Sequence, residues 1–352
     1  MTNIFSLLIT RPMGFIIEAI YTLIPNYGVA IILFTILIKA IIFPLTYKSQ
    51  KSMIKQQRIS PLLQELQKKY ADDKEKLSAE TMKLYKENNV SMTGGCLPLL
   101  LQFPIIIGLY RVIMKPLQFV KAINIDDQSI KGVTQVLVNS FPDLFNAKYK
   151  ITDILANSQI QLSKAAQNLL ADPEKLKMVK GVSVSSDQVM HTAHRFALDF
   201  NFLGIDLSRI PSDVTKLFTG QTHDLSILFV ILVPLIATLL TWLTTKLQQS
   251  QTKQYAKKPE KPKRYTGKEP EKDTTQTMTN TMNIMMPAMT AIFTFTMPAG
   301  IGFYWITSSA VQIAQQYFMN KHLNKKEGEI VVNQLDGKQS AGAGGKKKRK
   351  KR

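Results

Sequence analysis

Long apolar stretches alternate with strongly charged stretches along the 352-residue chain. The core of a bilayer, about 30 Å thick, is crossed by roughly 20 helical residues. The apolar stretches of this length, or close to it, are 27–46, 95–114, 225–245, 284–297 and 303–319. Pro and Gly residues between the last two favour a turn, so 284–319 is expected to form a hairpin of two helices. The pattern predicts an all-α polytopic membrane protein with five transmembrane helices.

The basic residues of the polar segments predict the orientation of these helices. Lys and Arg are abundant in three segments and rare before the first helix: ten lie in 47–91, nine in 246–280, eleven in 320–352 and one in 1–26. Short cytoplasmic loops are enriched in Lys and Arg. We therefore expect these three segments in the cytoplasm and the N-terminus outside. The segment 115–222 becomes an extracytoplasmic insert, and its length exempts it from the charge rule.

Two further segments have the pattern of amphipathic helices. Residues 11–24 place apolar side chains on one side of a helix. The segment 1–26 is therefore predicted to hold an amphipathic helix that lies on the outer leaflet of the membrane. An uncleaved anchor that continues into the first span is the alternative. Residues 47–91 have the periodicity of two helices joined at Asp72–Asp73. They are predicted to form a cytoplasmic helical hairpin that meets lipid head groups, a partner or a nascent chain.

The basic loop and the basic tail have a different composition. Residues 248–280 of the loop are rich in Lys, Pro, Gln and Thr, and both this segment and the tail 320–352 are expected to be disordered. The tail ends in a run of seven cations: Lys346, Lys347, Lys348, Arg349, Lys350, Lys351 and Arg352. Such a run binds phosphate groups without sequence preference. A docked ribosome and anionic membrane lipid are therefore both possible partners.

Lys39 places a charge in the middle of the first predicted span. A lysine at that depth costs about 2.5–3.5 kcal/mol on insertion scales, which the surrounding Ile, Leu, Phe and Val residues can offset. At 100° per residue, Thr35 lies on the same side of the helix as Lys39. The five spans contain no Asp or Glu. Because intramembrane charges usually mark a function, Lys39 is predicted to face the bundle interior or a wet cavity.

Three other spans also carry polar side chains, each on one side of its helix. They are Gln102 in the second span, Thr238, Thr241 and Thr245 in the third, and Trp305, Ser309 and Gln312 in the last. If these sides face inward, they line a hydrated groove that carries one positive charge. The alternative is that the Thr, Ser and Gln side chains only join helix to helix, as such residues do in membrane bundles.

The composition and the motifs exclude several classes of function. Cys96 is the one cysteine of the chain and cannot form an intrachain disulfide or a cysteine-based zinc site. The chain lacks the nucleophile elbow, the zincin motif and the phosphate loop. We therefore expect no catalytic residues, no metal and no cofactor, in a protein that is not an enzyme.

Several short motifs resemble those of the YidC/Oxa family of membrane protein insertases. They are Gly94–Pro104 in the second span, and Met286–Pro287, Phe295–Trp305 and Gln312–Tyr317 in the last hairpin. The segment Ser60–Tyr85 is similar to the cytoplasmic hairpin of that family. The matching regions, about 25–115 and 225–325, occur in the order that the family has.

The resemblance implies a five-helix bundle around a polar groove that is open to the cytoplasm and the lipid and closed toward the outside. Lys39 stands at the groove position where relatives more often carry Arg, and Trp305 and Gln312 match groove-facing positions. Two features depart from the family: the long insert 115–222, and a threonine, Thr244 or Thr245, where a glutamine is usual.

The function implied by the resemblance is that of an insertase and chaperone of the bacterial plasma membrane. It would insert and help to fold nascent membrane proteins, alone or with the Sec translocon. A small-solute or ion transporter with Lys39 as its anion site is the alternative, although internal repeats typical of transporters are not evident. A scaffold that binds ribosomes or lipid through its tail would leave the polar sides of the spans unexplained.

Overall fold

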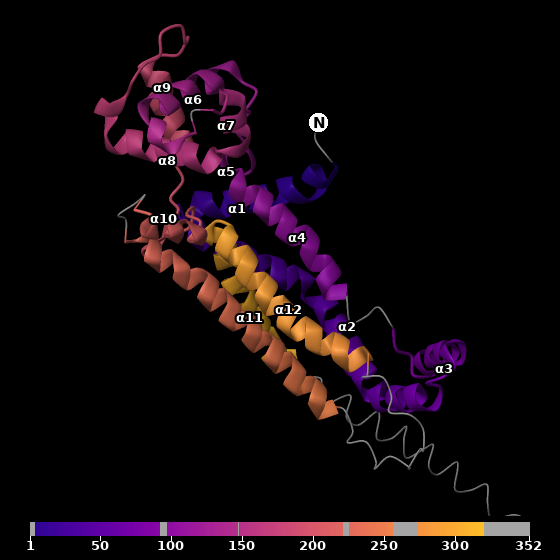
Figure 1. Cartoon of the computed structure of the whole chain (residues 1–352). Coiled ribbons are helices and arrows are strands. Elements are labelled where there is room, and N and C mark those ends of the chain that lie inside the picture. Colours follow the sequence, from indigo (N-terminus) through magenta and orange to yellow (C-terminus); the bar gives the residue numbers. More distant parts are fainter. Residues whose placement is uncertain (1–3, 92–96, 147, 221–224, 256–273, 320–352) are drawn as a thin grey trace, which may run out of the picture. The chain divides into compact units, whose positions relative to one another are not determined.

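The computed structural model describes residues 4–91, 97–146, 148–220, 225–255 and 274–319 (Figure 1). Helices make up almost all of the regular structure in these ranges, which confirms the all-α class. The chain divides into two compact units. Unit 1 comprises Met1–Ile42, Cys96–Leu243 and Thr274–Ser309, and unit 2 comprises Phe43–Gly95, Thr244–Asp273 and Ala310–Arg352.

The first part of the chain is a series of helices. The π-helix η1 (Ser6–Thr10) leads directly into α1 (Arg11–Leu23). Next comes α2 (Tyr27–Lys69), a single helix of 43 residues that contains the first predicted span and continues beyond it. A turn then leads to α3 (Lys74–Glu87), where the Asp73 carboxylate caps the helix by accepting a hydrogen bond of 2.9 Å from the Lys76 N–H. This turn falls at the predicted position, Asp72–Asp73.

The second predicted span lies in α4 (Leu97–Met114), and the insert follows it. The insert contains the short helix α5 (Pro116–Phe119), then α6 (Gln128–Ser140), α7 (Ile151–Asn157), α8 (Gln159–Ala171) and α9 (Ser186–Phe196). Short helical turns complete it: η2 (Pro142–Leu144), η3 (Pro173–Lys175), η4 (Pro211–Val214) and α10 (Thr215–Phe218). Helices α6 to α9 pack against one another as a small bundle (Figure 1).

Apolar side chains at helical spacing hold this bundle together. In α8, for example, Leu162, Ala165 and Leu169 are fully buried. Residues three or four positions apart share one side of a helix, so these three form a continuous apolar face. Asp172 and Pro173 follow, and α8 ends at Ala171.

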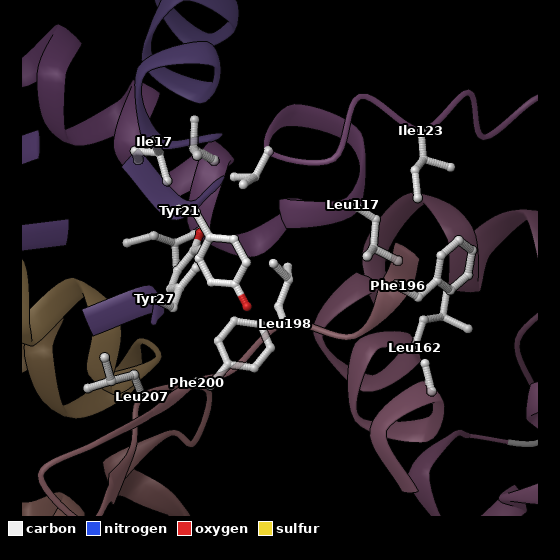
Figure 2. Close-up of a cluster of buried hydrophobic side chains, with 14 of the residues drawn as sticks. Ile17, Tyr21, Tyr27, Leu117, Ile123, Leu162, Phe196, Leu198, Phe200 and Leu207 are labelled. Carbon is white, nitrogen blue, oxygen red and sulfur yellow. The ribbon is translucent and has the colours of Figure 1, made fainter. Parts of the chain in front are cut away.

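The core of the insert continues into the N-terminal helices. Figure 2 shows Leu117 and Phe196 on one side of Leu198, and the rings of Tyr21 and Tyr27 on the other. The Tyr27 ring lies 6.4 Å from that of Tyr21 and 5.1 Å from that of Phe200, measured between centroids. The first turn of α2 is therefore packed into the insert as well as into the bundle of long helices.

Backbone hydrogen bonds also fix the insert to the first and last long helices. The Tyr27 N–H donates to the Asp199 carbonyl at 2.9 Å. The N–H groups of Ala299 and Gly300 donate to the carbonyls of Arg209 and Leu207, at 2.7 and 2.8 Å. The first N–H groups of a helix have no acceptor within the helix. The insert thus supplies acceptors at the points where both helices begin.

Between these contacts the insert forms a small β-hairpin. Strands β1 (Asn201–Phe202) and β2 (Ile205–Asp206) are antiparallel, and Phe202 pairs with Ile205. The two residues of the turn, Leu203 and Gly204, have φ angles of 53° and 78°. Positive φ at both central positions is the geometry of a type I′ turn, which matches the twist of a hairpin.

The last three long helices carry the remaining predicted spans. They are α11 (Ile227–Tyr255), α12 (Thr274–Thr296) and a helix at 299–319. Pro298 separates the last two, as the Pro/Gly cluster predicts. The expectation of disorder across 248–280 is wrong for its two ends, since 248–255 and 274–280 are helical. No Pro or Gly interrupts either end, so both helices continue past the apolar stretches. Residues 256–273 and the tail lie outside the described residues.

Unit 2 has a small core of its own. Ile54 and Met319 are buried there, and Phe43 and Tyr47 pack against them. The Phe43 ring lies 6.4 Å from the ring of Phe318 and 6.4 Å from that of Tyr47. The middle of α2 and the end of the 299–319 helix therefore meet through aromatic side chains.

Within the described residues, three helical stretches are long and apolar enough to cross a membrane: Ser6–Leu23, Tyr27–Gln56 and Ile227–Ser250. Two apolar helices are shorter, Gln102–Met114 and Ile284–Thr296. Two of the predicted spans thus lie in membrane-length helices. The number of spans and the interfacial position of the N-terminal helix stay predictions.

Candidate functional site

The end of the helical bundle beside the insert is assembled around the start of the 299–319 helix. The site where Gly300 would carry a Cβ lies 3.5 Å from Ile31 of α2 and 3.7 Å from Ile113 of α4. For Gly302 that position is 2.6 Å from Val233 of α11 and 3.5 Å from Thr294 of α12. A side chain at Gly302 would collide with Val233. The two glycines therefore let four other helices approach this one closely.

Three of these helices begin at the insert, and their buried faces change character along their length. Near the insert the buried residues are apolar: Ala30, Ile31 and Phe34 in α2, Val230, Val233 and Ala237 in α11, and Ala299 and Ile301 in the last helix. Farther along the buried residues are polar: Thr35, then Thr241 and Thr244, then Ser308 and Ser309. In these three helices the buried face is thus apolar beside the insert and polar in the next turns.

The opposite faces of the same helices are apolar and exposed. In α2, Ile36, Leu37 and Ile41 are exposed around the half-buried Lys39. In α11, Leu232, Leu235 and Leu239 are exposed on the side opposite Thr241. A soluble bundle would bury these leucines and expose the threonines. The reversed pattern is that of helices surrounded by lipid, with their polar side chains turned inward.

Lys39 lies one helical turn beyond Thr35, on the same side of α2. Thr35 is fully buried, and its hydroxyl donates to the Ile31 carbonyl of the same helix at 2.6 Å. Lys39 is half-buried and follows at the level where the buried faces have become polar. Its flexible four-carbon stem lets the ammonium reach along the helix.

Gln102 has a partner in another helix. Its side-chain amide donates to the Tyr304 hydroxyl at 2.7 Å, so α4 and the last helix are joined inside the bundle. The neighbouring Trp305 is half-buried and stacks on Phe293 of α12, with ring centroids 6.4 Å apart and ring planes at 10°. Gln102 therefore acts as a link between helices, which is the alternative considered for the glutamines.

The other predicted residues fall into three groups. Thr241 and Ser309 are buried and Thr238 is half-buried, all in unit 1, and the Thr241 hydroxyl donates to the Ala237 carbonyl at 2.8 Å. Thr245 and Gln312 are half-buried and belong to unit 2. The seven cations of the tail, 346–352, lie outside the described residues.

Several buried polar residues are not among the predicted site residues. Tyr304 is the partner of Gln102, and Thr290 and Thr294 bond to carbonyls of their own helix, α12, at 3.0 and 2.7 Å. Gln316 is buried in unit 2, and its amide has no hydrogen-bond partner among the described residues. The spacing of four between Thr290 and Thr294 was a usable signal, because it places both on one face. Tyr304 gave no such signal, since aromatic residues occur on every face of a membrane helix.

The long helices expose apolar side chains and bury polar ones, and α2 and α11 contain stretches long enough to cross a membrane. These features define an α-helical membrane protein. The model of a family described as 60Kd inner membrane protein matches residues 19–327. The chain belongs to this family, which confirms the resemblance seen in the motifs.

Relatives that carry the name membrane protein insertase YidC match parts of the chain. The protein from Nitratidesulfovibrio vulgaris (strain Miyazaki F) is 35% identical over 172 residues, which are 49% of this chain and 31% of that protein. The protein from Saccharophagus degradans is 46% identical over 110 residues, 31% of this chain and 20% of that protein. The protein from Actinobacillus succinogenes is 35% identical over 176 residues, 50% of this chain and 31% of that protein. The matched region is thus about a third or less of each relative's length.

Proposed function

We propose that the protein is a membrane protein insertase and chaperone of the bacterial plasma membrane, and that it forms and breaks no covalent bonds. The observation that carries the proposal is the change of the buried faces from apolar near the insert to polar around Lys39. A polar interior that reaches only partway through the membrane suits a protein that shortens a hydrocarbon barrier without opening a pore.

The mechanism follows from the cost of moving polar groups through lipid. An unpaired polar group in hydrocarbon costs several kcal/mol. A hydrated groove lined by Thr35, Thr241 and Ser309 would lower this cost for a short polar segment of a nascent protein. Lys39 would attract an acidic segment, and the membrane potential would help to move it outward. The apolar helix of the substrate would then leave into lipid, driven by burial of its own apolar surface.

The partners belong to the same proposal. The hairpin formed by the inner part of α2 and by α3 would receive the nascent chain. The basic tail would hold the ribosome or anionic lipid nearby through phosphate contacts. The Sec translocon would be a partner for larger substrates.

Neutralising Lys39 tests the role of its charge. We expect Lys39→Met to lower insertion of a small single-span protein with an acidic outer tail roughly fivefold, since a loss of about 1 kcal/mol of attraction corresponds to that factor. Lys39→Arg should keep most of the activity because it keeps the charge. The measurement is co-translational insertion into proteoliposomes without a translocon, scored by protection of the outer tail from protease.

Leu37→Ala is the matched control, because Leu37 is exposed on the opposite side of the same helix. It should insert the substrate like the native protein. Equal activity of Lys39→Met and the native protein would remove the charge from the mechanism. If the native protein inserts no better than empty liposomes, autonomous insertion is wrong, and solute flux across the same liposomes then tests the transporter alternative.

A further inference from the structure

The hairpin Asn201–Asp206 lies against the first and last long helices at the points where both begin. The Asn26 side chain donates to the Asn201 carbonyl at 2.8 Å and to the Asp199 carboxylate at 3.1 Å. The Phe202 ring lies where a Cβ on Gly28 would be, with its Cγ 2.4 Å from that position. The same ring is 4.9 Å from the ring of Phe303, between centroids.

The order of these contacts gives the direction in which the hairpin points. Along β1, Asn201 contacts Asn26, just before α2 begins, and Phe202 contacts Gly28, inside it. A second series of contacts runs along the last helix.

In that series, Arg209 bonds Ala299 and Leu207 bonds Gly300, whereas Phe202 packs on Phe303. On both helices, the residues nearer the turn contact positions deeper in the helix. Phe303 lies four positions after Ala299, which corresponds to about 6 Å along a helix. The turn therefore points along the helices, away from the bundle of α6 to α9 and toward the middle of α2 and of the 299–319 helix.

The turn itself carries a residue that its backbone does not favour. Leu203 has a φ of 53°, and the first position of a type I′ turn is usually Asn, Asp or Gly. Its side chain is 85% exposed, and nothing in the described chain lies within 4 Å of the place where a Cβ on Gly204 would be. A large apolar side chain is thus held out in the open by a conformation that disfavours it. Conflicts of this kind between local preference and structure tend to occur where a residue has a function.

We propose that the hairpin dips its turn into the outer leaflet of the membrane and that Leu203 anchors it among lipid acyl chains. The bilayer is the occupant because the exposed side chains of the helical segments beside the turn are apolar. Leu33 and Ile36 are exposed farther along α2, and Leu23 and Ile24 are exposed just before Asn26. The inference depends on α2 and the last helix crossing the membrane, and not on the insertase activity, so each can fail without the other.

A fluorescent probe on the turn tests the proposal in the full-length protein. The native cysteine is first replaced (Cys96→Ala), and Leu203→Cys is labelled with the environment-sensitive dye NBD in phosphatidylcholine and phosphatidylglycerol vesicles. We expect blue-shifted emission that loses about half its intensity when the lipids carry a quencher just below the head groups, the depth at which interfacial groups reside. Leu33→Cys is the lipid-exposed control. Tyr149→Cys, which is exposed in the insert, is the water-exposed control. Emission from position 203 that matches position 149 would overturn the proposal.

A second variant gives a result that does not depend on labelling. Leu203→Asn fits the turn at least as well as leucine, so its thermal unfolding in detergent should be unchanged or occur at a higher temperature. In vesicles, hydrogen exchange of the segment 201–206 should be several-fold faster than in the native protein, because the anchor is lost. Equal exchange of the two proteins in vesicles would contradict the proposal even if insertion activity is intact.

Discussion

At the scale of single residues, Asp206 joins the insert's helices to its hairpin. Its carboxylate accepts from the Lys164 ammonium at 2.8 Å and the Arg209 guanidinium at 3.4 Å, and it also accepts from the Ser208 hydroxyl. Burial by itself raises the pKa of Asp206, but the Lys164 charge and the hydrogen bonds outweigh it, so the pKa lies below its usual value. The ionised form is therefore the one that holds α8 to β2.

The lowered pKa gives Asp206 a pH-dependent effect on stability. A carboxylate with a depressed pKa in the fold stabilises it above the ordinary pKa, and this contribution is lost as the pH falls through the depressed value. We expect Asp206→Asn to lower the free energy of unfolding by about 1–3 kcal/mol at pH 7, and by progressively less as the pH falls below the ordinary pKa of aspartate. Denaturant unfolding in detergent, followed by protease resistance of the insert, measures the difference.

The pair of Asp172 and Lys175 offers a matched control. Its side chains are 44% and 60% exposed, against 23% and 27% for Asp206 and Lys164. Exposed ion pairs contribute little to stability, so Asp172→Asn should change unfolding by only a few tenths of a kcal/mol across this pH range. An equal loss of unfolding free energy in the two variants would show that the partial burial of Asp206 does not strengthen its ion pairs.

At the scale of elements, the contact of the hairpin with α2 depends on the missing side chain of Gly28. We expect Gly28→Ala to destabilise the protein by about 1–3 kcal/mol, because the new Cβ would overlap the Phe202 ring. Alanine also favours a helix by up to about 1 kcal/mol over glycine, so the measured loss is the net of both effects. The midpoint of thermal unfolding in detergent is the readout.

A double variant separates this collision from other effects of alanine. Phe202→Ala removes the ring that collides, so Gly28→Ala should cost little or nothing in that background, as coupled neighbours do in a mutant cycle. Gly300→Ala is the control at the other helix, where the closest atom is 3.4 Å from the new Cβ. Additive losses for Gly28 and Phe202 would show that the two residues do not compete for space.

Periodicity predicted helices where the structure has them, but it did not predict their partners. The 100° rule placed Thr35 and Lys39 on one side, and Thr35 is indeed buried. The hydrogen bond from Gln102 to Tyr304 joins positions 202 apart in sequence. The periodicity of one helix does not show which residue of another helix it will contact. The fold of the insert escaped prediction for the same reason, since it depends on contacts between residues far apart in sequence, such as Tyr27 with Phe200. The hydrated groove is still a prediction, and the Lys39 variants test it.

At the scale of the whole molecule, charge is distributed unevenly. The chain has a formal net charge of +20, and thirty of its 45 Lys and Arg residues lie in 47–91, 246–280 and 320–352. Deletion of 341–352 removes seven of these cations. We expect it to weaken insertion by translating ribosomes, most strongly at low salt, because phosphate contacts are salt-dependent.

The same deletion separates the possible functions. Solute flux through a transporter should survive it, and a scaffold should lose its binding entirely. The direct measurement is the fraction of ribosomes that co-sediment with proteoliposomes. It is compared at about 50 and about 200 mM salt, a range over which phosphate contacts weaken strongly. A tail-deleted protein that inserts at the native rate at both salt concentrations would remove the tail from the mechanism.

The hydrogen bonds that join the insert to the last helix also set an order in time. Ribosomes add about 5–20 residues per second, so Ala299 is made roughly 5–20 s after Arg209, the residue whose carbonyl it contacts. Tyr27 can bond Asp199 well before that. During synthesis the hairpin can therefore attach to α2 early. Its other side stays uncovered until the 299–319 helix has been made. The helix 299–319 completes this end of the bundle, so folding there cannot finish before that helix has been made.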